Sequence, residues 1–173
     1  MSVSLYDLSV ASYLQQLAGV AGFLEKGSKH CGEINIDPNA LVETRLHADM
    51  LPLQFQIQSV THHSIGAIEG VRQGVFSPPP PIPAQDYKGL QKMVADAREA
   101  LTKLTPAEVN GLAGRDVIFQ LRDFKLPFTA EGFLMSFSLP NFYFHATTAY
   151  DILRMKGVPL GKRDFTGPFR MKT

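Results

Sequence analysis

Residues 140–157 read PNFYFHATTAYDILRMKG, a stretch with the pattern of a helix that carries polar side chains on an otherwise apolar surface. Asn141, His145 and Thr148 follow one another at steps of four and three residues, so they share one face of that helix. Helical bundles build ligand and metal sites from such inward-facing side chains on opposing helices. The stretch therefore predicts both a long helix and the position of a functional site.

The composition is that of a folded globular domain. The chain has 173 residues, of which 45% are hydrophobic and 19% charged, and its net charge is +1. Without a basic run or a strong net charge, we expect neither nucleic acid nor an anionic membrane as a partner. The single cysteine, Cys31, excludes an internal disulfide and fits a reducing compartment. Since no apolar run resembles a signal peptide or a membrane span, we expect a single-domain bacterial protein of the cytoplasm, folded over residues 1–173.

Apolar residues recur at helical spacing in four segments of the chain. The pattern predicts helices over residues 5–25, 38–73, 86–104 and 130–156. Pro52 lies inside the second of these and Pro140 inside the fourth, so we expect a bend or an interruption at both positions. Gly157 is a typical C-cap for the fourth helix.

Two other segments are predicted to be extended. The run PPPPIP at 78–83 favours a stiff polyproline crossover, with recruitment of a proline-binding partner as the alternative. Alternating apolar residues on both sides of Arg122 and Asp123 predict a small hairpin. The expected fold class is therefore all-α, a four-helix bundle with a short β-hairpin inserted before the last helix.

The second predicted helix supplies polar residues to place opposite His145. Asp49, Gln56 and His63 are spaced by seven residues, so they share a face. A carboxylate at Asp49, together with Asn141 and His145, is the pattern of a weak metal site or of a proton-transfer pair. The alternative is that His145 is an interior histidine held by hydrogen bonds.

The remaining histidines and the cysteine are less informative. We expect His47, His62 and His63 to lie on a solvated helix face, and His62 and His63 cannot chelate one ion because neighbouring helical residues point about 100° apart. Cys31 lies beside Lys29, which favours a reactive thiol, but without a second cysteine a packing or surface role is the better interpretation.

Three stretches of the chain also carry a family resemblance: YDLSVASYLQQL, RLHADMLPLQFQIQ and LPNFYFHATTAYDILRMKGVPLGKRDF. They resemble an uncharacterised bacterial family of domains of unknown function that is grouped with the DinB/YfiT-like four-helix bundles. The resemblance covers nearly the whole chain and implies the same bundle fold.

The resemblance also implies a place for a metal. Relatives in the DinB/YfiT-like group are described as metal-binding proteins with three histidines, one on the second helix and two in an H-x-x-x-H on the fourth. Aligned through the end of the fourth helix, His145 takes the second position of that motif and Asn141 the first. Asp49 is the closest counterpart on the second helix, and His47 a weaker one. The implied divalent ion would be zinc, nickel, iron or manganese. Its site would thus be either remodelled to Asp49, Asn141 and His145 or lost.

Three hypotheses for the function follow. The first is a bundle that binds a small ligand in a polar pocket between the second and fourth helices, with Phe142 and Phe144 as further apolar walls. Its expected lining is Asp49, Gln56, Asn141, His145 and Tyr150. The second is a divalent-metal-dependent transferase, similar to the thiol S-transferases of the wider group, or a hydrolase, with the remodelled Asp, Asn and His site. The third is a structural homodimer that packs through the aromatic fourth helix.

Overall fold

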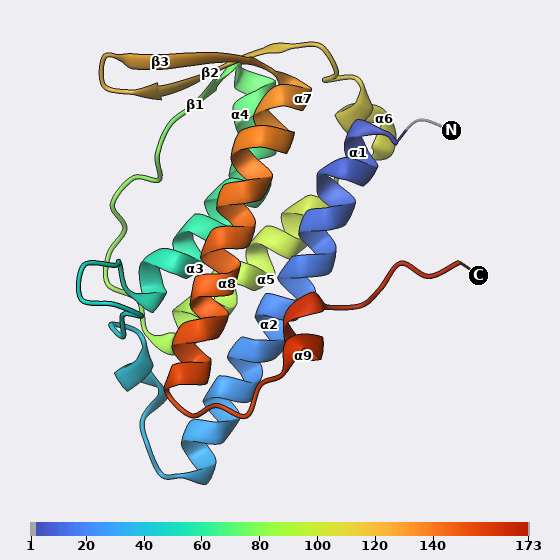
Figure 1. Cartoon of the computed structure of the whole chain (residues 1–173). Helices are drawn as coiled ribbons and strands as arrows, with labels where there is room; N and C mark the ends of the chain where they lie inside the picture. The colour runs from blue at the N-terminus through green and yellow to red at the C-terminus, as the bar shows by residue number, and fades with distance from the viewer. Residues whose placement is uncertain (1–2, 173) are drawn as a thin grey trace.

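The structure, a computed structural model, describes residues 3–172 and is mostly helical with a small three-stranded sheet (Figure 1). Four long helical segments lie side by side, and two of them contain a π-helical turn, named η2 and η3 here. Their elements are α1 (Leu5–Leu8) and α2 (Val10–Glu33); α3 (Leu53–Thr61), η2 (His62–Gly66) and α4 (Ala67–Gln73); α5 (Tyr87–Thr102); and α7 (Ala130–Phe133), η3 (Leu134–Ser138) and α8 (Leu139–Met155). α3 packs against α8 and α5, and α2 packs against α5 and α8.

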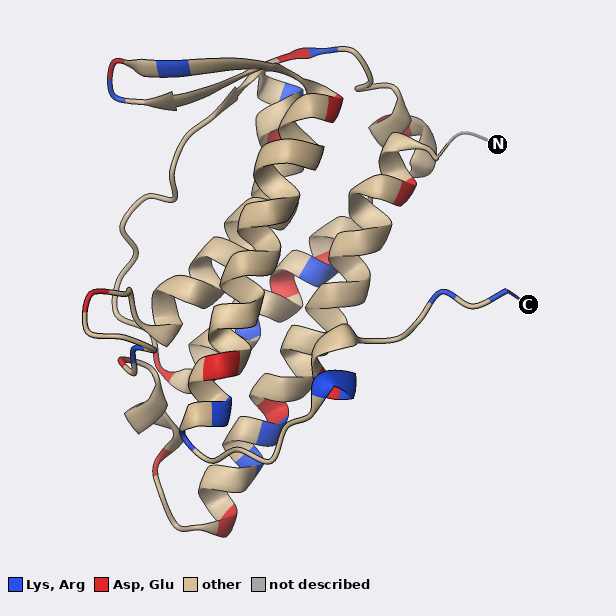
Figure 2. Cartoon of the chain, in the orientation of Figure 1, with Lys and Arg blue, Asp and Glu red and all other residues tan. Residues whose placement is uncertain are grey.

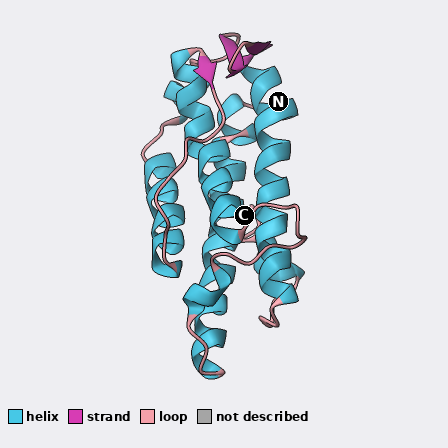
Figure 3. Cartoon of the chain, turned by 90° about the vertical axis from the view of Figure 1, so that its left-hand side faces the viewer, coloured by secondary structure: helices cyan, strands magenta, loops and turns pink. Residues whose placement is uncertain are grey.

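The shorter elements connect and cover these segments. They are η1 (Pro38–Leu41), β1 (Val75–Phe76), α6 (Pro106–Asn110), β2 (Asp116–Leu121), β3 (Phe124–Thr129) and α9 (Lys162–Thr166). The sheet has the order β1-β2-β3, with β1 parallel and β3 antiparallel to β2, and Leu121 opposite Phe124 next to the turn. It lies at one end of the molecule, above α4 and α7 (Figures 1 and 3).

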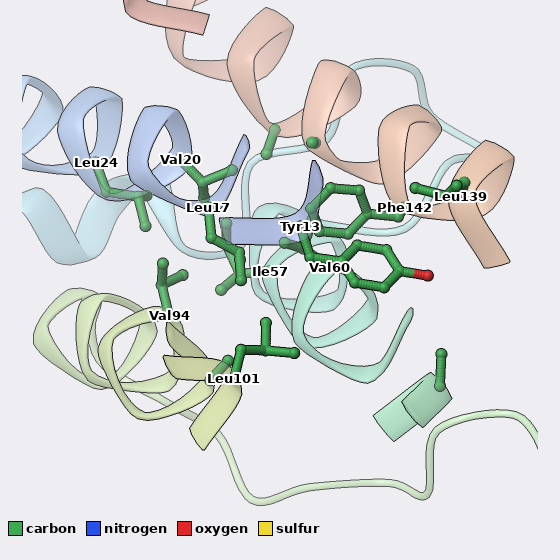
Figure 4. Close-up of a cluster of buried hydrophobic side chains, with 14 of the residues drawn as sticks. Tyr13, Leu17, Val20, Leu24, Ile57, Val60, Val94, Leu101, Leu139 and Phe142 are labelled. Atoms are coloured by element: carbon green, nitrogen blue, oxygen red, sulfur yellow. The ribbon is translucent and has the colours of Figure 1, made fainter. Parts of the chain in front are cut away.

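Apolar side chains from the long segments fill the space between them (Figure 4). The ring of Tyr13 on α2 meets that of Phe142 on α8 edge to face, with centroids 5.0 Å apart. Such aromatic pairs add to the free energy gained by burying the rings. The other labelled members of this cluster are Leu17, Val20, Leu24, Ile57, Val60, Val94, Leu101 and Leu139.

A chain of buried hydrogen bonds crosses this core. The Ser138 hydroxyl in η3 donates to the backbone carbonyl of His63 in η2, with 2.7 Å between the oxygens. Tyr13 Oη lies 2.9 Å from Ser138 Oγ. Because the single hydroxyl proton of Ser138 is used toward His63, Tyr13 is the donor in that second bond. Burial also raises the pKa of Tyr13, which keeps it a neutral donor. The chain joins the first, fourth and second helical segments.

The second helical segment begins later than the sequence pattern predicted. Residues 38–41 form only a 3-10 turn and α3 starts after Pro52, so the prediction of a helix over 38–73 was wrong for the part before Pro52. The carbonyls of Thr44 and Val42 accept the N–H groups of Leu53 and Gln54 at the start of α3. These long-range bonds satisfy donors that a helix N-terminus leaves free. The intervening loop is mostly exposed.

The first helical segment is longer than the predicted range of residues 5–25. α2 continues to Glu33, and the backbone at Gly27 lies directly beneath the hydroxyl of Tyr87. That hydroxyl donates to the Leu24 carbonyl at 2.8 Å. Gly27 therefore provides room for Tyr87 on α5, a close approach that a local pattern does not reveal.

The proline-rich crossover at 78–83 is attached to α3 by a row of polar side chains. Gln58 Nε2 donates to the Pro80 carbonyl at 2.6 Å, and His62 Nε2 donates to the Ser77 carbonyl at 2.7 Å. Gln54 Nε2 also donates to the Pro83 carbonyl, at 3.4 Å. Spacings of four residues place all three side chains on one helix face. The crossover therefore covers a face of α3 different from the one that meets α8.

Substitutions along the buried hydrogen-bond chain should have unequal effects on stability. Ser138→Ala leaves the His63 carbonyl and the Tyr13 hydroxyl without partners, and we expect it to lower the free energy of unfolding by about 2–3 kcal/mol. Tyr13→Phe removes one donor while Ser138 still bonds to His63, so its expected cost is about 1 kcal/mol. Urea unfolding of both variants measures the two losses. A cost for Ser138→Ala no larger than that for Tyr13→Phe would contradict the chain.

Candidate functional site

A hydrogen bond between α3 and α8 defines the candidate site. Oε1 of Gln56 lies 2.8 Å from Nδ1 of His145. Nε2 of Gln56 donates to the backbone carbonyl of Leu51 at 2.7 Å, which fixes the orientation of the amide. Gln56 is buried and His145 is half-buried. Two side chains far apart in the sequence are thus held together at the contact between the second and fourth segments.

His63 is a second imidazole at this place. Its ring lies nearly parallel to that of His145, with centroids 6.0 Å apart, and it also contacts Phe76 and Phe137. Only 6% of His63 is exposed, so the expectation that it lies on a solvated face was wrong. His47 is exposed as expected, but it lies in the loop before α3 and not on a helix, whereas His62 is half-buried against the Ser77 carbonyl. The sequence did contain a signal for the position of His63, because its spacing of seven residues from Gln56 places both side chains on one helix face.

Two buried polar atoms on the same helix face have no hydrogen-bond partner within the described part of the chain. They are Oγ of Ser59 and Nδ1 of His63, and these residues follow Gln56 by three and seven positions. Buried polar groups in folded proteins are almost always paired with protein or with ordered water. Of the two residues, His63 is the one whose ring lies against that of His145.

The other predicted site residues lie elsewhere. Asp49 is in the loop before α3, where its carboxylate is 84% exposed and bonds to the ring of His47. Asn141 is half-buried, and its Nδ2 donates to the Phe137 carbonyl in η3. The ring of Tyr150 packs edge to face with those of Phe23 and Phe165, which belong to α2 and α9. Within residues 3–172, none of the hydrogen bonds or ring contacts of these three side chains involves the His145 ring.

The donor set does not fit a divalent metal held by three side chains. Within residues 3–172, no group of three or more His, Cys, Asp or Glu side chains is placed to hold an ion. Nδ1 of His145 is already engaged by Gln56, and Asp49 is paired with His47 in the loop. Protein metal sites with open positions usually keep three side-chain ligands. The cysteine is no substitute, because Cys31 is buried and burial raises the pKa of its thiol.

Aromatic side chains contact His145 from α3 and from its own helix, α8. The ring of Phe55 on α3 and that of Phe144 on α8 stand edge-on to the imidazole, with centroid distances of 5.8 and 5.2 Å. Phe144 is 56% exposed, and Leu51 beside the site is 46% exposed. Large apolar side chains next to half-buried polar groups are typical of small-molecule sites.

Burial keeps both imidazoles neutral. It lowers the pKa of His145 to about 4. It also lowers the pKa of His63 to about 3, with a further contribution from the neighbouring His62 and His145 rings. Since an unperturbed histidine has a pKa near 6.5, each ring at neutral pH has one N–H and one nitrogen lone pair.

Comparisons with known proteins give a family and a structural neighbour. Residues 5–166 match the family described as Domain of unknown function (DUF1993). The structure is similar to the crystal structure of a DinB family member protein from Shewanella denitrificans, with a TM-score of 0.79 and 27% sequence identity over 98% of this chain and 95% of that chain. No curated protein matches the sequence. Throughout residues 3–172, no helix is long and apolar enough to cross a bilayer.

Acid should destabilise the protein through His63. The folded pKa is about 3 and the unfolded value about 6.5, so between these values the unfolded chain binds more protons and stability falls as the pH falls. From about pH 7 to about pH 5, we expect this one residue to lower the free energy of unfolding by about 2 kcal/mol. Urea unfolding of the wild type and of His63→Leu at both pH values measures this contribution.

The matched control is His47→Gln, because that imidazole is exposed in the loop before α3. This variant should keep the pH dependence of the wild type, whereas His63→Leu should have a shallower one. If His63→Leu loses as much stability on acidification as the wild type, the neutral buried imidazole is not the cause.

Proposed function

The chain belongs to the Domain of unknown function (DUF1993) family, and we propose that it is a DinB-like four-helix bundle that binds a small molecule between its second and fourth helices. Membership confirms the resemblance found in the sequence to a domain-of-unknown-function family grouped with DinB-like proteins. In this proposal the β2–β3 hairpin is the insertion before the last helix of the bundle.

The Gln56–His145 contact carries the proposal. It places a half-buried imidazole at the junction of α3 and α8, with its Nε2 outside every hydrogen bond of the described residues. That nitrogen is also not one of the buried unpaired atoms, so solvent reaches it. An imidazole with one nitrogen free of protein hydrogen bonds, in contact with a second imidazole and two phenylalanine rings, is an arrangement that a small molecule can complete.

The alternative is a divalent-metal-dependent transferase or hydrolase. Its support is the pair of neutral imidazoles, His63 and His145, since neutral histidine is the commonest metal ligand in proteins. A third ligand would have to come from a side chain that the structure places elsewhere, such as Asp49. For this reason ligand binding without a metal is the function that the geometry supports best.

A fragment screen read out by NMR tests the proposal. We expect binders to shift the ring resonances of His145 and His63, because these rings line the site, and to leave those of His30 and His47 unchanged. His145→Ala should abolish the response while the variant remains folded. Binding that shifts only His30 or His47, or the same response in His145→Ala, would place any ligand elsewhere on the molecule.

Metal content separates the alternative from the proposal. Plasma mass spectrometry on protein purified without a chelator or a histidine tag should find no stoichiometric zinc, nickel, iron or manganese. Near-stoichiometric metal that disappears in His145→Ala would instead support the metal-dependent enzyme.

A further inference from the structure

The orientation of the Gln56 amide determines which of its atoms faces His145. An amide nitrogen only donates hydrogen bonds and an amide oxygen only accepts them. The Leu51 carbonyl, 2.7 Å away, requires the nitrogen of Gln56 on its side. The opposite orientation would place two oxygen acceptors against each other. Oε1 is therefore the atom that faces the ring of His145 at 2.8 Å.

This orientation fixes the position of the proton on His145. An accepting Oε1 requires an N–H at Nδ1, and a neutral imidazole has only one N–H. Burial, which disfavours the charged form, keeps the ring neutral at physiological pH. Nε2 therefore carries a lone pair, and this nitrogen is the one that solvent reaches. The arrangement is that of a histidine whose tautomer is set by the hydrogen bond of its other nitrogen.

The two helical stretches that meet at His145 carry no charged side chains. Between Asp49 and Glu69 the chain has no Asp, Glu, Lys or Arg, and the same holds between Glu131 and Asp151. Figure 2 shows these uncharged stretches as the tan middle parts of α3 and α8. A charged ligand between them would lose hydration without gaining a counter-ion, which is unfavourable. The site therefore favours an uncharged ligand.

Apolar side chains around the His145 ring suit a flat apolar body. The rings of Phe55 and Phe144 both contact the imidazole, and Leu51 and Phe144 are 46% and 56% exposed. Covering such rings with another ring gains hydrophobic and aromatic contact energy.

We infer that the site binds an uncharged aromatic molecule that donates a hydroxyl or N–H hydrogen bond to Nε2 of His145. The inference rests on the proposed function and adds the chemical class of the ligand. Gln56 acts as a positioning residue, since it sets the tautomer of His145 through Nδ1.

Phenol and anisole are the probes that test this class, because they share an aromatic ring and differ in the hydroxyl donor. We expect phenol to bind about fivefold more tightly than anisole in NMR titrations that follow the His145 ring, as one neutral hydrogen bond provides about this ratio. Equal binding of the two at His145 would overturn the inference and leave the proposed function intact. If neither probe nor any screened fragment shifts His145, the proposed function itself fails.

A long-range proton–nitrogen spectrum of the histidine rings gives a second readout that needs no ligand. In the wild type it should show Nδ1 of His145 protonated and Nε2 unprotonated, and a protonated Nε2 would overturn the inference. Gln56→Leu removes the acceptor, so both the fixed tautomer and the preference for phenol should be lost. Gln58→Leu is the matched control: Gln58 bonds to the Pro80 carbonyl instead, so this variant should keep both.

Discussion

Three of the four long helical segments are held in register by the buried hydrogen bonds from Tyr13 through Ser138 to the His63 carbonyl. Inside a core, a polar group without a partner costs more than a pair contributes, so arrangements that complete every bond of the chain are favoured. The π-helical turns η2 and η3 each contain one end of the Ser138–His63 bond. Such turns interrupt the regular helical ladder and are frequent at functional sites.

The candidate site depends on this constraint. The bond to the His63 carbonyl fixes its backbone beside the fourth segment, where its ring lies nearly parallel to that of His145, and the contact of α3 with α8 brings Gln56 to the same imidazole. The face that joins the two helices is uncharged along its length, as an interior face must be. Near His145 the face reaches solvent and ends in exposed aromatic and aliphatic side chains, Phe144 and Leu51. The site is therefore a contact between two core helices that reaches the surface at His145.

Much of the helical pattern was readable from local spacing, and its errors have identifiable causes. The segment before Pro52 was predicted to be helical, but the carbonyls of residues 42 and 44 accept N–H groups from the first turn of α3 instead. The first helix was predicted to end at residue 25, yet α2 continues past Gly27, where the Tyr87 hydroxyl lies against its backbone. In both cases a partner distant in the sequence overrides the local preference, and a local pattern carries no information about that partner.

For the candidate site, the sequence placed His145 on an inward face of the last helix. It also placed Gln56 and His63 on a common face of the second helix. Both statements follow from helical periodicity. The sequence could not show that Gln56 bonds to His145, that His63 is buried, or that Asp49 lies in an exposed loop paired with His47. Those outcomes depend on the register between α3 and α8 and on where α3 begins. Register is fixed by packing and by buried hydrogen bonds between segments, and these exist only once the helices have come together.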